Sequence, residues 1–179
     1  MKAVWLTVLL GVIVLPAPVG AGSRLKTAFP GEPAVLGSPD GQHRVRWVPP
    51  ADESDQHHLL LSDAPDGHEV ELLAFPRGID ALWSRSGSHL AVTNHWASDE
   101  ATVLLWESFS GKARDLLEEL AEHEHQRAAG WNAHHIYLEA EGWQGDDVLL
   151  LHLWGYGDPS QPAVDRRYEY VLGRGFSRK

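Results

Sequence analysis

The sequence contains no cysteine, a single methionine and fewer basic than acidic residues. The lack of cysteine and the shortage of basic residues each exclude a class of function. Without cysteine there are no disulfides, no thiol nucleophile, no cysteine-ligated metal and no lipid-modified N-terminal cysteine. The 15 lysines and arginines against 25 aspartates and glutamates give a formal charge of −10. Nucleic-acid binding requires a basic surface that displaces counterions from phosphate. We therefore expect no nucleic-acid partner.

Long apolar runs are also scarce, and the one that occurs lies at the N-terminus. Met1–Lys2 is followed by the uncharged run Ala3–Leu15, then by two prolines and the small residues Val19–Gly20–Ala21. A basic start, an apolar middle and small residues before a cleavage point are typical of a secretory signal peptide. We predict a signal peptide over residues 1–21 and a periplasmic or secreted mature protein without a membrane span. An uncleaved anchor is the alternative.

The rest of the chain consists mainly of short segments with β character, separated by Gly, Pro, Asp and Ser. Residues 22–33 show little periodicity and are expected to be a flexible start of the mature protein, so the predicted domain covers residues 34–179. The expected strands are His43–Val48, His57–Ser62, Glu69–Phe75, His89–Asn94, Thr102–Phe109, His135–Glu141, Val148–Trp154 and Val164–Leu172. Leucines at helical spacing within Lys112–Ala129 predict one inserted amphipathic helix, near residues 113–128.

Three turn segments are similar to one another. They are Ser38–Pro39–Asp40–Gly41, Trp83–Ser84–Arg85–Ser86–Gly87 and Trp143–Gln144–Gly145–Asp146–Asp147. Ser38 and Ser84 lie 46 residues apart, a normal length for one four-stranded propeller blade.

The stretch Ile79–Val92 resembles the repeat of TolB-type β-propellers, an apolar strand followed by Trp-Ser-Pro-Asp-Gly and a second apolar strand. The first copy has Gly37 at the tryptophan position, and the second has Arg85 and Ser86 in place of Pro-Asp. The resemblance implies a binding scaffold of the cell envelope or a partner of an enzyme domain, and it carries no catalytic residues.

The number of repeats limits the architecture, because closed propellers have about four to eight blades. We therefore predict a mainly β fold of three propeller-blade-like antiparallel repeats, arranged as an open stack, a half-ring or a sandwich, with one inserted helix. Unpaired sheet edges favour either cover by the helix or a homodimer formed through the edges.

The 11 histidines lack the spacing of a metal site. The adjacent pairs His57–His58 and His134–His135 lie in β-like segments, where neighbouring side chains point to opposite faces. The chain also lacks a nucleophile elbow, a phosphate-binding loop and a calcium loop. We therefore predict no catalytic, cofactor-binding or metal-ligating residue, and no cofactor.

Tryptophan is abundant, with eight residues in the chain. Trp47, Trp83 and Trp106 fall in or beside predicted strands and are expected in the core. The candidate binding surface is formed by aromatic residues that lie among glycines or at a strand end, namely Trp131, Trp143, Trp154 and Tyr156. Exposed rings supply stacking area for a ligand. The alternative is that these rings close the end of the sheet against the helix.

These observations together favour an exported binding module without catalytic activity, whose partner is a protein or a small ligand in the cell envelope. Two other functions remain open. One is a small envelope hydrolase whose histidine and carboxylate site is assembled from distant segments. The other is an inhibitor or immunity-type partner of an envelope enzyme.

Overall fold

The computed structural model describes residues 26–52, 56–63, 67–109, 111–124, 135–157 and 163–179. These residues are mainly β with one short helix among them, which confirms the predicted fold class. The predicted signal peptide and Trp131 lie outside the described residues. In the described part of the chain, no helix is long and apolar enough to cross a membrane.

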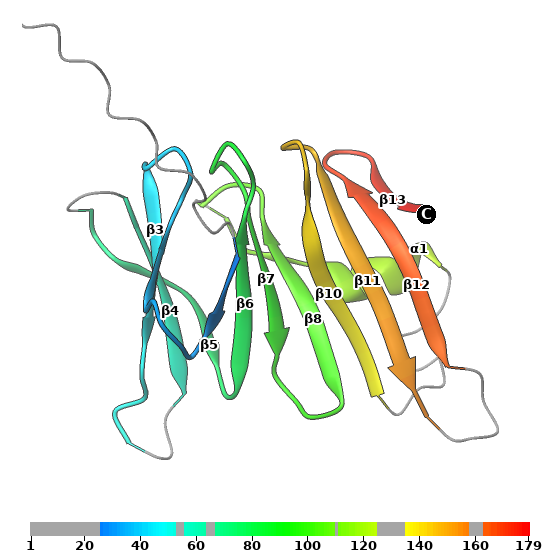
Figure 1. Cartoon of the computed structure of the whole chain (residues 1–179), viewed down its shortest axis with the longest axis horizontal. Helices are drawn as coiled ribbons and strands as arrows, with labels where there is room; N and C mark the ends of the chain where they lie inside the picture. Colours follow the sequence, from blue (N-terminus) through cyan, green and yellow to red (C-terminus); the bar gives the residue numbers. More distant parts are fainter. Residues whose placement is uncertain (1–25, 53–55, 64–66, 110, 125–134, 158–162) are drawn as a thin grey trace, which may run out of the picture.

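The strands after β1 form three antiparallel units, each made of four strands that follow one another in the chain. The first unit contains β2 (Val35–Gly37), β3 (His43–Val48), β4 (His57–Asp63) and β5 (Val70–Phe75). The second contains β6 (Gly78–Trp83), β7 (Leu90–His95), β8 (Glu100–Trp106) and β9 (Arg114–Asp115). The third contains β10 (His135–Gln144), β11 (Val148–Tyr156), β12 (Val164–Val171) and β13 (Gly175–Arg178). The units stand side by side in chain order, as an open stack with the first and third at opposite ends (Figure 1).

The described part of the segment 22–33 contains a strand, which differs from the expectation of a flexible start. Its residues Lys26–Phe29 form β1, which pairs antiparallel with β6 in the second unit. Thr27 and Phe29 are buried, whereas the residues that alternate with them are exposed. This alternation covers only four residues and is too short to be recognised in the sequence.

Two apolar cores hold the stack together. The first lies between the first and second units and includes Val45, Leu59, Trp83 and Trp106. The second lies between the second unit, the third unit and the helix, and includes Leu105 and Leu151. The second and third units are also joined by a parallel pairing of β8 with β10, so that their strands form one sheet.

The helix α1 (Leu116–His123) is shorter than the predicted segment. It begins late because Arg114–Asp115 pair with β8 as strand β9. The Asp115 carboxylate then accepts hydrogen bonds from the backbone N–H groups of Leu117 and Glu118, which caps the helix. The buried side chains of α1 pack in the core against the β10–β12 sheet (Figure 1).

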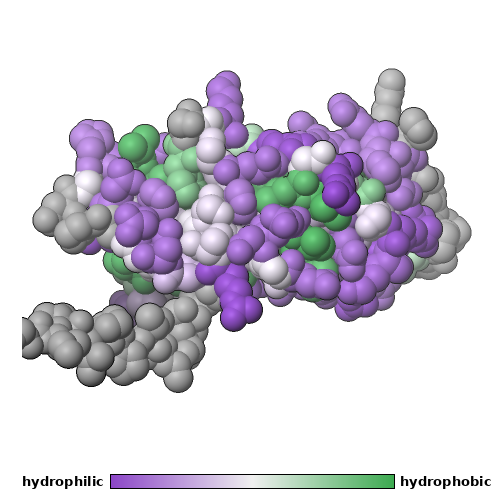
Figure 2. Space-filling view, turned by 90° about the horizontal axis from the view of Figure 1, so that it is seen from above, coloured by the Kyte–Doolittle hydropathy of each residue, from purple (hydrophilic) through white to green (hydrophobic). Residues whose placement is uncertain are grey.

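The three similar turns occupy the same place in each unit, between its first and second strands. In the first two units the hydrogen bonds are also equivalent, because Ser38 N donates to His43 O and Ser84 N donates to His89 O. The serine hydroxyl accepts from the backbone N–H of the same histidine in both units. All three turns lie at one end of the stack, whose surface is largely hydrophilic with some apolar areas (Figure 2).

Charged side chains on the outward faces of the terminal units pair with one another. On the first unit, Arg46 pairs with Glu69. On the third unit, His152 pairs with Asp165, and Arg167 pairs with Glu141. Polar outer faces of this kind keep a stack of repeats from adding further units.

Candidate functional site

Four rings form an aromatic cluster at the end of the third unit that lies opposite the three turns. They belong to His135 and Tyr137 of β10 and to Trp154 and Tyr156 of β11. Antiparallel register places His135 opposite Tyr156 and Tyr137 opposite Trp154. Because side chains alternate along each strand, these four residues share one face of the hairpin.

The rings in each cross-strand pair stack closely. The ring centroids of Tyr137 and Trp154 are 4.2 Å apart with 22° between their planes, and those of His135 and Tyr156 are 4.4 Å apart with 12°. The rings of Trp154 and Tyr156 lie side by side along β11, with 6.2 Å between centroids and 21° between planes. The cluster is therefore a nearly parallel set of rings, held in register by two paired strands.

The cluster faces away from the helix. The residues that alternate with it on β11, including Leu151 and Leu153, belong to the core shared with α1. Trp154 and Tyr156 therefore do not close the sheet against α1. Trp154 is partly buried, and Tyr156 is 51% exposed.

Trp143 is not part of the aromatic cluster, although its odd number would place it on the same face of β10 as Tyr137. A β-bulge between Ala140 and Gly142 shifts the register, so that Trp143 pairs with Leu149 on the inner face. There its indole stacks on His89 and donates to the carbonyl of Leu82, across 3.4 Å. Of the three predicted surface residues that the structure describes, it brings Trp154 and Tyr156 together and places Trp143 elsewhere.

The loop between β7 and β8 supports the cluster. The hydroxyl of Tyr137 donates to the backbone carbonyl of Ser98 across 2.7 Å. Burial raises the pKa of Tyr137, and the neighbouring Tyr156 and the charge of Asp99 raise it further. The phenol therefore stays protonated in neutral solution and remains a hydrogen-bond donor.

The same loop carries Trp96, whose side chain is 47% exposed. Burial raises the pKa of the nearby Glu100, and the charges of Asp115 and Asp99 raise it further, although the neighbouring Trp96 indole opposes them. Sequence reasoning missed Trp96, His135 and Tyr137. For Trp96 the available signal was its position in a short loop between two strands.

Polar groups border the cluster on the side of β12. Asp165 lies opposite Trp154 in the sheet, and its carboxylate is 2.8 Å from His152 Nε2. The Asp165 side chain is 73% exposed. Beyond it, Arg167 Nε is 3.3 Å from the Glu141 carboxylate. The acidic and basic groups beside the rings are thus engaged with one another.

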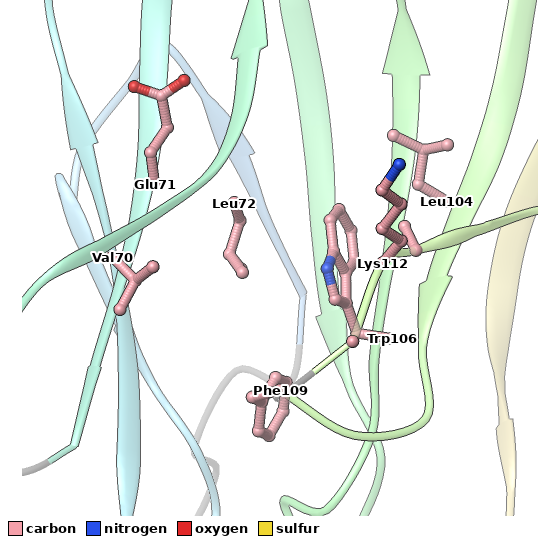
Figure 3. A pocket seen from close by; sticks show the side chains of 9 residues that line it. Val70, Glu71, Leu72, Leu104, Trp106, Phe109 and Lys112 are labelled. Carbon is pink, nitrogen blue, oxygen red and sulfur yellow. The ribbon is translucent and has the colours of Figure 1, made fainter.

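A separate groove of about 630 Å³ lies between the first and second units. Its walls include Val70 and Leu72 of β5 on one side, and Trp106, Phe109 and Lys112 on the other (Figure 3). A smaller groove of about 270 Å³ shares Val70 and Phe109 with it. β5 is the last strand of its sheet, and Val70 is 56% exposed.

The smaller groove is also lined by Ser62, Asp63 and His68. The Ser62 hydroxyl accepts from Arg44 Nε, and the Asp63 carboxylate contacts His43 Nδ1 across 3.0 Å. These contacts pair the serine and the aspartate with residues other than His68. Within the described ranges, no group of three His, Asp or Glu residues is arranged to hold a metal ion.

Comparison with known proteins assigns no function, so a functional proposal rests on the geometry described above. The chain matches no protein-family model. It also matches no curated protein.

Proposed function

We propose that this protein is an exported binding module without catalytic activity of its own, acting in the periplasm or outside the cell. In this proposal its ligand or protein partner binds at the aromatic cluster. The observation that carries the proposal is the half-exposed ring of Tyr156, stacked on His135 and aligned with Trp154. Rings held in place by paired strands offer contact area at a small entropic cost.

The proposed export rests on the N-terminal sequence pattern, a basic start followed by an apolar run and small residues. An acidic chain with a formal charge of −10 is consistent with a partner other than nucleic acid. The proposed resemblance to TolB-type repeats, which typically serve as envelope scaffolds, points in the same direction.

Capture of partners from an envelope extract tests this function. We expect the tagged protein to retain a partner that the Tyr156→Ala variant loses. Val35→Ala is the control, because it removes an exposed apolar side chain from β2, in another unit. Equal capture by all three proteins would contradict a role for the aromatic cluster.

A homodimer through the free edge of β5 is part of the same proposal. Unpaired strand edges present backbone donors and acceptors that invite pairing, and the apolar groove lies beside this edge (Figure 3). We expect Val70→Lys to reduce any concentration-dependent association measured by analytical ultracentrifugation. Unchanged association in this variant would place the dimer contact elsewhere.

A further inference from the structure

The rings of Trp154 and Tyr156 each have one side that no other ring of the described residues covers, which follows from the pairing of the rings. A flat ring has two faces. On the side of β10, Tyr137 covers one face of Trp154, and His135 covers one face of Tyr156. The opposite faces of both rings are turned toward β12. There the residue paired with Trp154 is Asp165, whose short side chain is largely exposed. The two rings therefore offer a flat apolar surface bordered by a carboxylate.

The acidic groups beside this surface are paired with basic side chains of the protein. Asp165 and Glu141 both contact His152, and Glu141 also contacts Arg167. A charged ligand would have to compete with these pairs, at a cost in desolvation. A neutral ligand with many hydroxyl groups can instead use the lone pairs and N–H groups that the pairs leave free.

We propose that the aromatic cluster binds a neutral carbohydrate, a deduction that rests on the proposed binding function. Consecutive sugar rings stack their C–H faces on Tyr156 and on Trp154. Their hydroxyl groups bond to Asp165 and His152, which lie beside the rings on β12 and β11. The alignment of two rings along one strand, 6.2 Å apart, suits consecutive sugars of an extended β-linked glycan.

Soluble hexasaccharides of β-linked glucose and of β-linked N-acetylglucosamine are the probes for this site. Binding to the full chain is measured by calorimetry and by quenching of tryptophan fluorescence. We expect one of the two to bind, with an affinity that is the same at low and high salt because the ligand is neutral. Tyr156→Ala is expected to weaken binding by about tenfold, whereas Tyr156→Phe keeps the stacking surface and most of the affinity.

A further variant tests the polar groups beside the two rings. Asp165→Asn, which keeps the shape of the side chain, is expected to weaken binding severalfold. Unfolding midpoints of the three variants establish that each is folded, which is expected because Tyr156 and Asp165 are at least half exposed. Equal affinity in wild type and Tyr156→Ala would overturn the proposal.

The outcomes also separate this inference from the proposed function. If neither hexasaccharide binds while Tyr156-dependent capture of a protein persists, the carbohydrate proposal is wrong and the binding function stands. If tetramethylammonium binds instead, with an affinity that falls as salt increases, the site takes a cation. If neither capture nor any of these probes depends on Tyr156, both proposals fail.

Discussion

The indole Nε1 of Trp143 donates a hydrogen bond to the backbone carbonyl of Leu82, 3.4 Å away in the preceding unit. The same contact occurs one unit earlier, where Trp83 Nε1 donates to the carbonyl of Leu36 across 3.4 Å. Each indole also stacks on the histidine that ends the preceding turn, His89 for Trp143 and His43 for Trp83. The stack is therefore joined by a repeated contact between the tryptophan of one unit and the first strand of the unit before it.

Replacing either tryptophan with phenylalanine tests this contact. Trp83→Phe removes this buried hydrogen bond and leaves unfilled volume where a fully buried indole was, so we expect a loss of about 1–3 kcal/mol in the free energy of unfolding. Trp143→Phe should cost less, because Trp143 is only partly buried. Urea unfolding of the two variants measures both losses. A wild-type midpoint for Trp83→Phe would show that the contact contributes nothing.

The first repeat has Gly37 at the tryptophan position. Among the residues that the structure describes, the first unit has no unit beside it that could offer a carbonyl to an indole at this position. Gly37 is exposed, and a Cβ built on it would meet no atom within 4 Å. We therefore expect Gly37→Trp to change the free energy of unfolding by less than about 0.5 kcal/mol. A large loss in this variant would mean that the first repeat tolerates only a small residue for another reason.

The repeated turns could be predicted from the sequence, whereas the hydrogen bond from tryptophan to the preceding unit could not. The spacing of Ser38 and Ser84 predicted equivalent turns, and the structure confirms them. The partner of each tryptophan is a backbone carbonyl. Because every residue has one, the sequence does not show which residue accepts the bond. The aromatic cluster was predicted only in part for a similar reason. The bulge after Ala140 changes the face of Trp143, and it depends on the register between β10 and β11.

The turn of the second unit makes a close contact that requires glycine. Gly87 has φ of +80°, and a Cβ at this position would lie 2.6 Å from Oδ1 of Asp40 in the first unit. Gly145 in the third unit has φ of +68° but meets no atom within 4 Å. We expect Gly145→Ala to cost about 1–2 kcal/mol from backbone strain alone. Gly87→Ala should cost more than this, because the Asp40 side chain must also move.

Thermal unfolding of both alanine variants measures the difference. The double variant Gly87→Ala/Asp40→Ala should lack the clash between the new Cβ and the Asp40 side chain. Its loss of stability should therefore be closer to that of Gly145→Ala, once the cost of removing Asp40, measured in Asp40→Ala, is subtracted. Equal losses for the two single variants would show that the Asp40 side chain moves aside freely.

The N-cap of α1 gives a further prediction. Asp115 Oδ1 accepts from the backbone N–H of Leu117 at 3.0 Å and of Glu118 at 3.3 Å. Asp115→Ala should therefore lower the free energy of unfolding by about 1 kcal/mol. Asp115→Asn keeps an oxygen acceptor and should lose less. If the two variants were equally destabilised in urea, the charge of Asp115 would matter more than its capping bonds.

The last prediction concerns acid sensitivity at the junction of β1, β6 and β7. Asp80 lies on β6, and its carboxylate is 3.5 Å from His95 Nε2 and 3.7 Å from Lys26 Nζ. The hydrogen bond with His95 lowers the pKa of Asp80 below its ordinary value of 3.8, and the charge of Lys26 adds to this effect, although burial opposes it. Because the folded pKa lies below the unfolded one, this carboxylate stabilises the fold above about pH 4, and its contribution is lost as the pH falls further.

Asp80→Asn should therefore be less stable than wild type near neutral pH, and the two proteins should converge in strongly acidic buffer. Urea midpoints measured from neutral pH down to about pH 2 follow this convergence. Asp63→Asn is the matched control, because that carboxylate also contacts a histidine but is 78% exposed, where solvent screens the charge. The control should track wild type throughout. Parallel curves for Asp80→Asn and wild type would show that the pairing around Asp80 does not contribute to the acid sensitivity of the fold.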